Sequence, residues 1–254
     1  MLEAVHLTKR YASVPAVQDL SFTLRPGQVL GCLGPNGSGK STTVKMLTGL
    51  LEPSRGRVQF NGHNIQDDLP GYRKRLGYVP EEPHLYPYLT GWEYLEMIGT
   101  LRGMPEHELL KKIDALLTLF SLHPSRHGSI GSYSKGMRQR ILLIAAIMHD
   151  PEIFIFDEPL SGLDVTSALV FKNLVQALGH AGKLVFYCSH VLEVVEKVCT
   201  DVLILRKGIV IAEDSVANIG QILGQSLENT FLHLVDNVDT MSVARDILSV
   251  MKVA

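Results

Sequence analysis

The chain has 254 residues, of which 46% are hydrophobic and 20% charged, and its formal net charge is −2. This composition excludes a disordered chain and fits one large globular domain, or such a domain with an appendage. The charge balance also gives no electrostatic indication of binding to nucleic acid or to an anionic membrane surface.

The N-terminal residues and the cysteines indicate the compartment. MLEAVHLTKRY has no basic segment followed by an apolar one, so we expect no signal peptide. The longest apolar run, residues 141–148, is far shorter than the roughly 20 residues that span a bilayer. Three cysteines in apolar contexts are typical of small core residues in a reducing compartment. We expect an intracellular chain that reaches a membrane only through a partner.

Short apolar runs alternate with helical patterns, which predicts an α/β fold with parallel strands. Asn61-Gly62 and Lys207-Gly208 are typical of hairpin turns and predict antiparallel strands at an edge. The predicted strands, in chain order, are residues 29–33, 57–60, 76–79, 153–157, 184–188 and 201–206.

Between residues 88 and 150 the strand patterns stop and the apolar spacing becomes helical. We therefore expect an α/β core formed by residues 1–87 and 151–215, with a helical subdomain, residues 88–150, inserted into it. Weaker patterns in residues 216–254 predict a small C-terminal appendage.

Residues 34–41, GPNGSGKS, fit the phosphate-loop pattern G-x-x-x-x-G-K-[ST], between a predicted strand and a predicted helix. The glycines let backbone N–H groups surround a phosphate beside the positive end of a helix. Lys40 is expected to reach the β- and γ-phosphates, and the Ser41 hydroxyl to complete a Mg²⁺ site. The flanking elements disfavour a merely glycine-rich turn, so a P-loop NTPase core is expected. The predicted nucleotide-binding residues of this loop are Gly34, Pro35, Asn36, Gly37, Ser38, Gly39, Lys40, Ser41 and Thr42.

Two acids, Asp157 and Glu158, end the predicted strand IFIFD. In phosphate-loop NTPases an aspartate at the end of a buried strand holds Mg²⁺, and Asp157 is placed for that role. Glu158 can polarise an attacking water or accept its proton. The alternative is a charged pair that caps the helix predicted near Asp164, but the phosphate loop favours the catalytic interpretation.

Further motifs resemble those of the ATP-binding cassette (ABC) ATPases over residues 11–190. Residues 134–139, SKGMRQ, are similar to the family's signature sequence. The resemblance implies that Ser134 and Gly136 contact the γ-phosphate of ATP bound to a second copy, although alone the segment is typical of an N-capped helix. Tyr11 resembles the aromatic residue that stacks on adenine; a half-buried tyrosine at a strand end is the alternative.

Residues 161–164, SGLD, resemble the family's D-loop, which places Asp164 at a dimer interface. His190 resembles the switch histidine that contacts the γ-phosphate. Two residues depart from the family pattern. Lys135 replaces a glycine of the signature and adds a positive charge near the partner's phosphates. Glu81 replaces the usual glutamine; it can still ligate Mg²⁺ but cannot donate hydrogen bonds as an amide does.

The resemblance implies an enzyme that hydrolyses ATP to ADP and phosphate, with Mg²⁺ as cofactor. Two copies would hold two ATP molecules between phosphate loops and opposite signatures. A homodimer is the simpler expectation, because one chain carries candidates for every catalytic role. The transported substrate is not indicated by the sequence.

The motion of such a dimer is expected to drive an integral membrane permease of exporter type, with the chain peripheral on the cytoplasmic face. Three segments resemble those of exporter ATPases: residues 133–140, YSKGMRQR, residues 77–90, GYVPEEPHLYPYLT, and a tail marked by Leu227, Glu228, Phe231 and Leu232. Within the second segment, residues 84–88, HLYPY, lie where a permease helix would dock, unless the tyrosines simply pack on the subdomain. One alternative is a soluble ABC ATPase acting on ribosomes or DNA, which lacks support from a second cassette, a coiled coil or basic charge. A small-molecule kinase is the other, and it leaves the signature unexplained.

Overall fold

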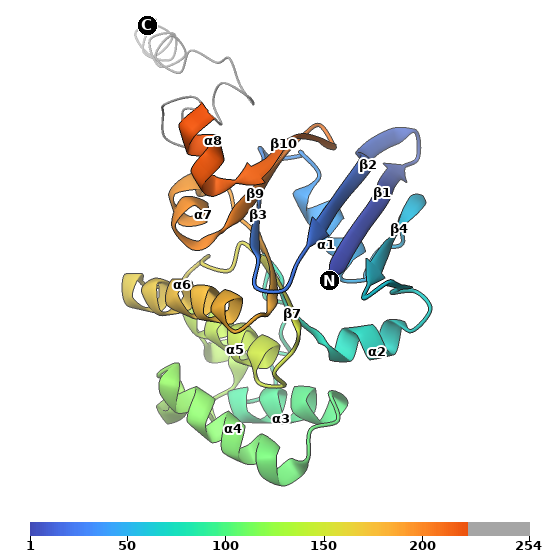
Figure 1. Ribbon diagram of the computed structural model, residues 1–254. Helices are drawn as coiled ribbons and strands as arrows, with labels where there is room; N and C mark the ends of the chain where they lie inside the picture. Colours follow the sequence, from blue (N-terminus) through green and yellow to red (C-terminus); the bar gives the residue numbers. More distant parts are fainter. Residues whose placement is uncertain (223–254) are drawn as a thin grey trace, which may run out of the picture.

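The computed structural model describes residues 1–222 and confirms an α/β fold with a parallel sheet (Figure 1). Short 3₁₀ turns lie at His123–Ser125 and Ile130–Ser132. The helices are α1 (Lys40–Leu47), α2 (Leu69–Lys74), α3 (Gly91–Leu101), α4 (Glu106–Leu119), α5 (Lys135–Ile147), α6 (Val165–His180), α7 (Leu192–Val198) and α8 (Val216–Ile222). The strands are β1 (Leu2–Tyr11), β2 (Val14–Leu24), β3 (Val29–Leu33), β4 (Arg55–Phe60), β5 (His63–Asn64), β6 (Leu76–Val79), β7 (Ile153–Asp157), β8 (Leu184–Cys188), β9 (Asp201–Arg206) and β10 (Ile209–Ser215).

The larger sheet has the order β10-β9-β3-β8-β7-β6, and all its neighbours are parallel except β9 and β10. Every residue of β3, β7 and β8 is buried, as expected for parallel strands covered on both faces. The β9–β10 hairpin confirms the antiparallel edge predicted at Lys207-Gly208.

Two layers cover this sheet (Figure 1). Helices α5, α6 and α7 pack on one face, where Phe154, Phe156 and Tyr187 contribute to a shared apolar cluster. Helix α1 and a second, antiparallel sheet of order β2-β1-β4-β5 pack on the other face. Cys32 and Cys188 belong to the apolar cluster on this second face. All three cysteines are free and buried, which confirms their prediction as core residues. The carboxyl ends of β3, β7 and β8 therefore lie between the two layers.

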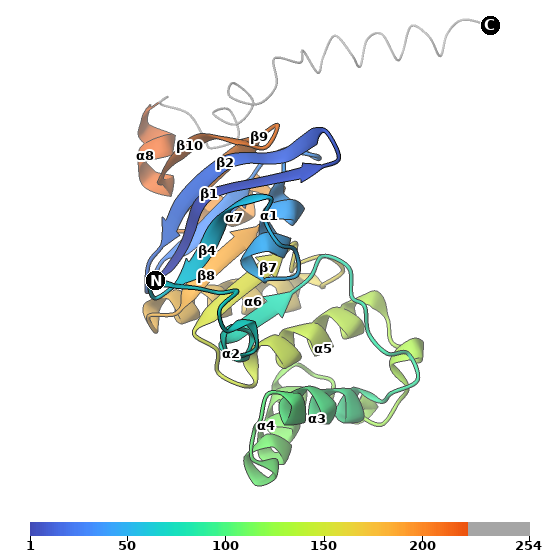
Figure 2. The ribbon, with the colours of Figure 1, turned by 90° about the vertical axis from the view of Figure 1, so that its right-hand side faces the viewer.

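The segment between residues 88 and 150 is helical wherever it is regular. Thr90 and Glu93 form a capping box that starts α3. Helices α3, α4 and α5 share a separate apolar cluster, and Figure 2 shows α3 and α4 at the opposite end of the molecule from the β1–β2 hairpin. Helix α5 contributes residues to this cluster and to the core cluster, so it joins the two parts.

The proposed tail motif, with Leu227, Glu228, Phe231 and Leu232, lies outside the described residues, as does the predicted appendage beyond Ile222. Among residues 1–222, none of the helices combines the length and the apolar character that crossing a bilayer requires.

Candidate active site

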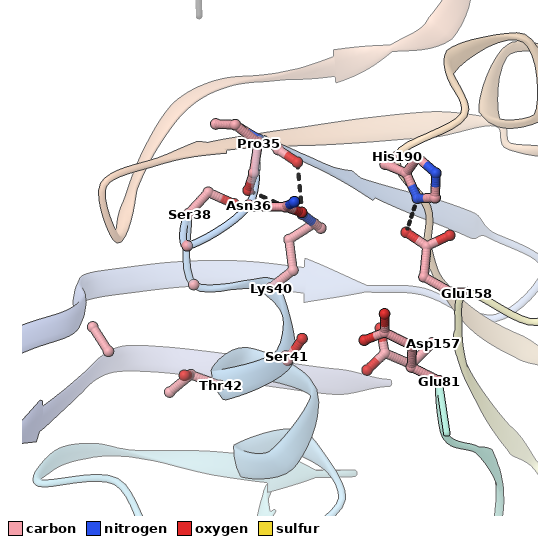
Figure 3. Close-up of a pocket in the computed structure, with 14 residues that line it drawn as sticks. Pro35, Asn36, Ser38, Lys40, Ser41, Thr42, Glu81, Asp157, Glu158 and His190 are labelled. Carbon is pink, nitrogen blue, oxygen red and sulfur yellow. Dashed lines mark hydrogen bonds and ion pairs between the residues drawn. The ribbon is translucent and has the colours of Figure 1, made fainter. Parts of the chain in front are cut away.

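A cavity of about 600 Å³ opens at the carboxyl ends of β3, β7 and β8 (Figure 3). This is the edge of a parallel sheet at which ligands are usually bound. Loops that are distant in sequence meet there: one follows each of these strands, and a fourth, which carries Glu81, follows β6. The lining residues are Ala16, Gly34, Pro35, Asn36, Gly37, Ser38, Gly39, Lys40, Ser41, Thr42, Glu81, Asp157, Glu158 and His190.

The phosphate loop joins β3 to α1 and forms one wall of the cavity. Gly39 has φ +107°, and a Cβ there would lie 2.7 Å from the Ala16 carbonyl oxygen, so only glycine fits. The Lys40 ammonium donates hydrogen bonds to the carbonyl oxygens of Gly34 and Pro35, at 2.6 and 3.1 Å. The lysine is thus folded across its own loop, with its charge at the cavity (Figure 3).

The opposite wall is acidic. Asp157 ends β7 and is only 5% exposed. Burial, together with the negative charges of Glu81 and Glu158, raises the pKa of the Asp157 carboxyl from 3.8 to about 6, against the opposing effect of Lys40 and Lys45. Figure 3 shows the carboxylates of Asp157 and Glu81 close together, across the cavity from the phosphate loop. This side of the cavity therefore has an excess of acidic groups.

A divalent cation fits that imbalance. The Ser41 hydroxyl and the carboxylates of Asp157 and Glu81 are oxygen donors, the ligand type that Mg²⁺ prefers. Within residues 1–222, no group of three or more His, Cys, Asp or Glu side chains is arranged to hold a metal ion by itself. Mg²⁺ commonly takes only one or two carboxylates and completes its shell with phosphates and water, so this donor set suits an ion that arrives with a nucleotide.

Glu158 and His190 form a hydrogen-bonded pair beside Asp157. His190 Nδ1 donates to Glu158 Oε1 at 2.7 Å, and the Ser189 hydroxyl donates to Oε2 at 3.3 Å. The Glu158 backbone has φ +48°, an unusual conformation for a bulky side chain, and its N–H donates to the Cys188 carbonyl oxygen. The carboxylate is therefore fixed by both its backbone and its two side-chain partners.

Four of the predicted residues do not line the cavity. Tyr11 is half exposed at the end of β1, with the Lys9 ammonium 5.9 Å from its ring centroid. Ser134 and Asp164 are N-caps of α5 and α6, where they accept from the N–H groups of Met137 and Ser167. Gly136 follows Ser134 in the first turn of α5.

Two residues at the site were missed in the sequence analysis. Ala16 lines the cavity because β2 passes beside the phosphate loop, and a small apolar side chain indicates no chemistry. Ser189 bonds to Glu158 from the end of β8; its position directly before His190 was the only available indication.

We predict that Asp157→Asn raises the free energy of unfolding of the nucleotide-free chain near pH 7.5. A pKa raised on folding stabilises the folded state below the unfolded value of 3.8, and this contribution is lost as the pH rises to about 6. The loss is on the order of 3 kcal/mol. Urea unfolding at pH 4.5 and 7.5 should show a larger gain from Asp157→Asn at the higher pH.

The matched control for this prediction is Asp67→Asn, which removes an exposed carboxylate. Its effect should stay within about 0.5 kcal/mol at both pH values. An equal effect of the two variants, or a gain from Asp157→Asn only at low pH, would contradict the buried, destabilising charge.

Comparison with known proteins identifies close similarities. The sequence profile of the ABC transporter family matches residues 17–161. The ABC transporter ATP-binding protein NatA of Bacillus subtilis is 37% identical over 199 residues, 78% of this chain and 81% of NatA. A solved structure of an ATP binding subunit of an ABC transporter superposes with a TM-score of 0.87 at 31% identity, covering 92% of this chain and 99% of that one.

A second solved structure shares the fold at lower identity. It is described as the dimeric structure of a post-hydrolysis state of the ATP-binding cassette MJ0796 bound to ADP and Pi. The TM-score is 0.79 at 24% identity, with 85% of this chain and 99% of that chain covered.

Proposed function

The chain belongs to the ABC transporter family, and we propose that it is the subunit that binds and hydrolyses ATP to drive a separate membrane permease. The observation that carries this proposal is the cavity in which a phosphate loop faces Asp157 and the Glu158–His190 pair. A cationic, N–H-rich wall opposite a carboxylate wall is suited to a Mg²⁺-bound nucleotide triphosphate.

In the proposed reaction, the ammonium of Lys40 leaves the carbonyls of its own loop and donates to the β- and γ-phosphates. Ser41, Asp157 and Glu81 would hold Mg²⁺, which supplies neutralisation of phosphate charge when bound. Glu158 orients the attacking water and accepts its proton, while His190 keeps the carboxylate in place. Positioning and charge neutralisation account for most of the acceleration in phosphoryl transfer.

We propose that hydrolysis requires a second copy of the chain. Ser134 and Gly136 do not line the cavity of their own chain, so they would contact ATP bound to a partner. Asp164 caps α6 directly after the loop that would lie along the interface. ATP contacted from both sides holds the two copies together, and the loss of its γ-phosphate releases them. Tyr11 would complete the site by stacking on adenine.

We propose an exporter-type permease as the membrane partner, with the chain on the cytoplasmic face. The support is the resemblance of residues 77–90 to the corresponding segment of such ATPases, within which residues 84–88 would form the docking surface. In this segment Tyr86 is 61% and Tyr88 94% exposed, and exposed aromatic side chains are typical of interfaces. Tyr86 also packs near Tyr94 of α3, with 6.5 Å between ring centroids. Part of the segment therefore packs on the helical subdomain, and the rest of it is exposed.

The test is an affinity pull-down of the tagged Glu158→Gln chain from detergent-solubilised native cells in the presence of ATP and Mg²⁺. We expect stoichiometric recovery of one protein with several apolar spans, identified by mass spectrometry. Recovery of ribosomal or DNA-associated proteins, with no membrane protein, would instead support the soluble ABC alternative.

The variant Tyr86→Ala tests the docking segment. We expect it to lose most of the permease recovered, and to uncouple transport, because an interface aromatic typically contributes about 2 kcal/mol or more. Nucleotide binding should be unchanged, since Tyr86 does not line the cavity. Val170→Ala removes a comparably exposed apolar side chain from α6, away from the cavity, and should change neither measurement. Equal loss of binding and transport in Tyr86→Ala would contradict a docking role.

A further inference from the structure

The loop that follows Glu158 lies against the first turns of α5. Gln139, which is fully buried, donates from Nε2 to the Pro159 carbonyl oxygen at 3.0 Å. At Gly136 an added Cβ would lie 2.6 Å from the Gly162 carbonyl oxygen, so the two backbones are in close contact. The start of α5 and the loop of residues 159–162 therefore pack as one unit.

Lys135 adds a third contact to this unit. Its ammonium donates to the Ser161 hydroxyl at 2.8 Å. Its stem covers Gly162, where an added Cβ would lie 2.8 Å from Lys135 Cγ. Gly162 also has φ +80°, a conformation that favours glycine. The side chain of Lys135 thus occupies the space above the loop and bonds to it.

The contact continues to Glu158 through the main chain. The Ser161 N–H donates to the Glu158 carbonyl oxygen at 3.1 Å and closes a tight turn. Glu158 is held in its left-handed conformation within that turn, and its carboxylate is directed to His190 at the cavity. A displacement of Ser161 would change the backbone that aims this carboxylate.

We propose that Lys135 is a positioning residue for ATP hydrolysis: through Ser161 it fixes the turn that aims the Glu158 carboxylate, and it links this turn to the helix start that carries Ser134. The inference rests on the proposed ATPase function. It differs from the expectation that Lys135 mainly adds a positive charge near the partner's phosphates, because the ammonium bonds to Ser161 of its own chain.

Steady-state ATPase measurements on the full-length chain separate these two roles. Lys135→Met keeps the stem over Gly162 but removes the ammonium, and we expect kcat to fall about tenfold with KM for ATP changed less than twofold. Lys135→Arg keeps a donor and should retain kcat within about threefold. Ser161→Ala should match Lys135→Met, and the double variant should be no worse than either single one, because the two residues act through one contact.

Two kinetic results would overturn the proposal. One is a rise of KM in Lys135→Met with kcat preserved, which indicates direct binding of phosphate. The other is additive losses in the double variant, which indicate that Lys135 does not act through Ser161.

Hydrogen exchange provides a readout that does not depend on ATP hydrolysis. In the nucleotide-free chain we expect the N–H groups of Ser161 and Leu163 to exchange about fivefold faster in Lys135→Met than in the unmodified chain or Lys135→Arg. Unchanged exchange in Lys135→Met would refute the positioning role. If the unmodified chain fails to hydrolyse ATP, the proposed function fails, and the exchange rates still decide whether Lys135 fixes the turn.

Discussion

Replacing Lys40 with alanine is expected to raise the dissociation constant for ATP with Mg²⁺ by about 100-fold. The ammonium now donates to two carbonyl oxygens of its own loop, and in the complex it would donate to phosphate oxygens instead. A 100-fold change corresponds to about 2.8 kcal/mol, which is the size of one hydrogen bond to a charged group, about 1.5–3 kcal/mol. The loss should appear in binding itself, measured by calorimetry or by a fluorescent ATP analogue, before any effect on turnover.

The matched control for Lys40→Ala is Lys74→Ala, which removes one positive charge away from the cavity. Lys74 is exposed in the last turn of α2 and does not line the cavity. We expect its dissociation constant to change less than threefold, because an exposed charge in water is well screened. If both variants bind ATP as the unmodified chain does, the nucleotide is not held by the phosphate loop.

The strands of the parallel sheet could be predicted from the sequence because they are buried on both faces. Leu76–Val79, Ile153–Asp157 and Leu184–Cys188 have the predicted bounds, since each is a nearly unbroken apolar run. The helical character of residues 88–150 was also predicted from the apolar spacing, and helices α3, α4 and α5 lie within this segment.

In the antiparallel sheet, the β4–β5 hairpin was predicted from Asn61-Gly62. Strands β1 and β2 were not predicted, and their irregular pairing explains why. Strands β1 and β2 change register between Ala4 and Leu7 and again between Leu7 and Lys9, while His6 and Asp19 have positive φ. Each irregularity moves the following side chains to the other face, so the alternation by which a half-buried strand is recognised is interrupted. The long-range pairing of β1 with β4 then stabilises a strand that has no clear local pattern.

The chemical groups of the candidate site were found from motifs, whereas the contacts that orient them were not. Lys40, Asp157 and Glu158 follow buried strands in a pattern that indicates phosphate chemistry. By contrast, the Lys135–Ser161 contact joins residues 26 positions apart, and it depends on how the first turn of α5 meets a loop. Such contacts depend on tertiary packing, which residue type and spacing do not encode.

Glu158→Gln is expected to lower ATP turnover by about 10²–10⁴-fold while ATP and Mg²⁺ remain bound, because a positioned general base contributes a factor of that size. The amide has nearly the shape of the carboxylate and can still accept a hydrogen bond from His190 or Ser189, but it cannot accept a proton from water. With hydrolysis stalled, ATP should keep two copies joined. Analytical ultracentrifugation should therefore show a dimer with ATP and a monomer with ADP.

Glu82→Gln is the matched control, since it removes an exposed carboxylate that does not line the cavity and should leave turnover unchanged. The two assays then separate the roles of the site. Full turnover by Glu158→Gln would refute the assignment of the general base, whereas slow turnover without a dimer would preserve that assignment and refute ATP as the bridge between copies. Only slow turnover together with an ATP-dependent dimer supports a catalytic Glu158 in a site that a second copy completes.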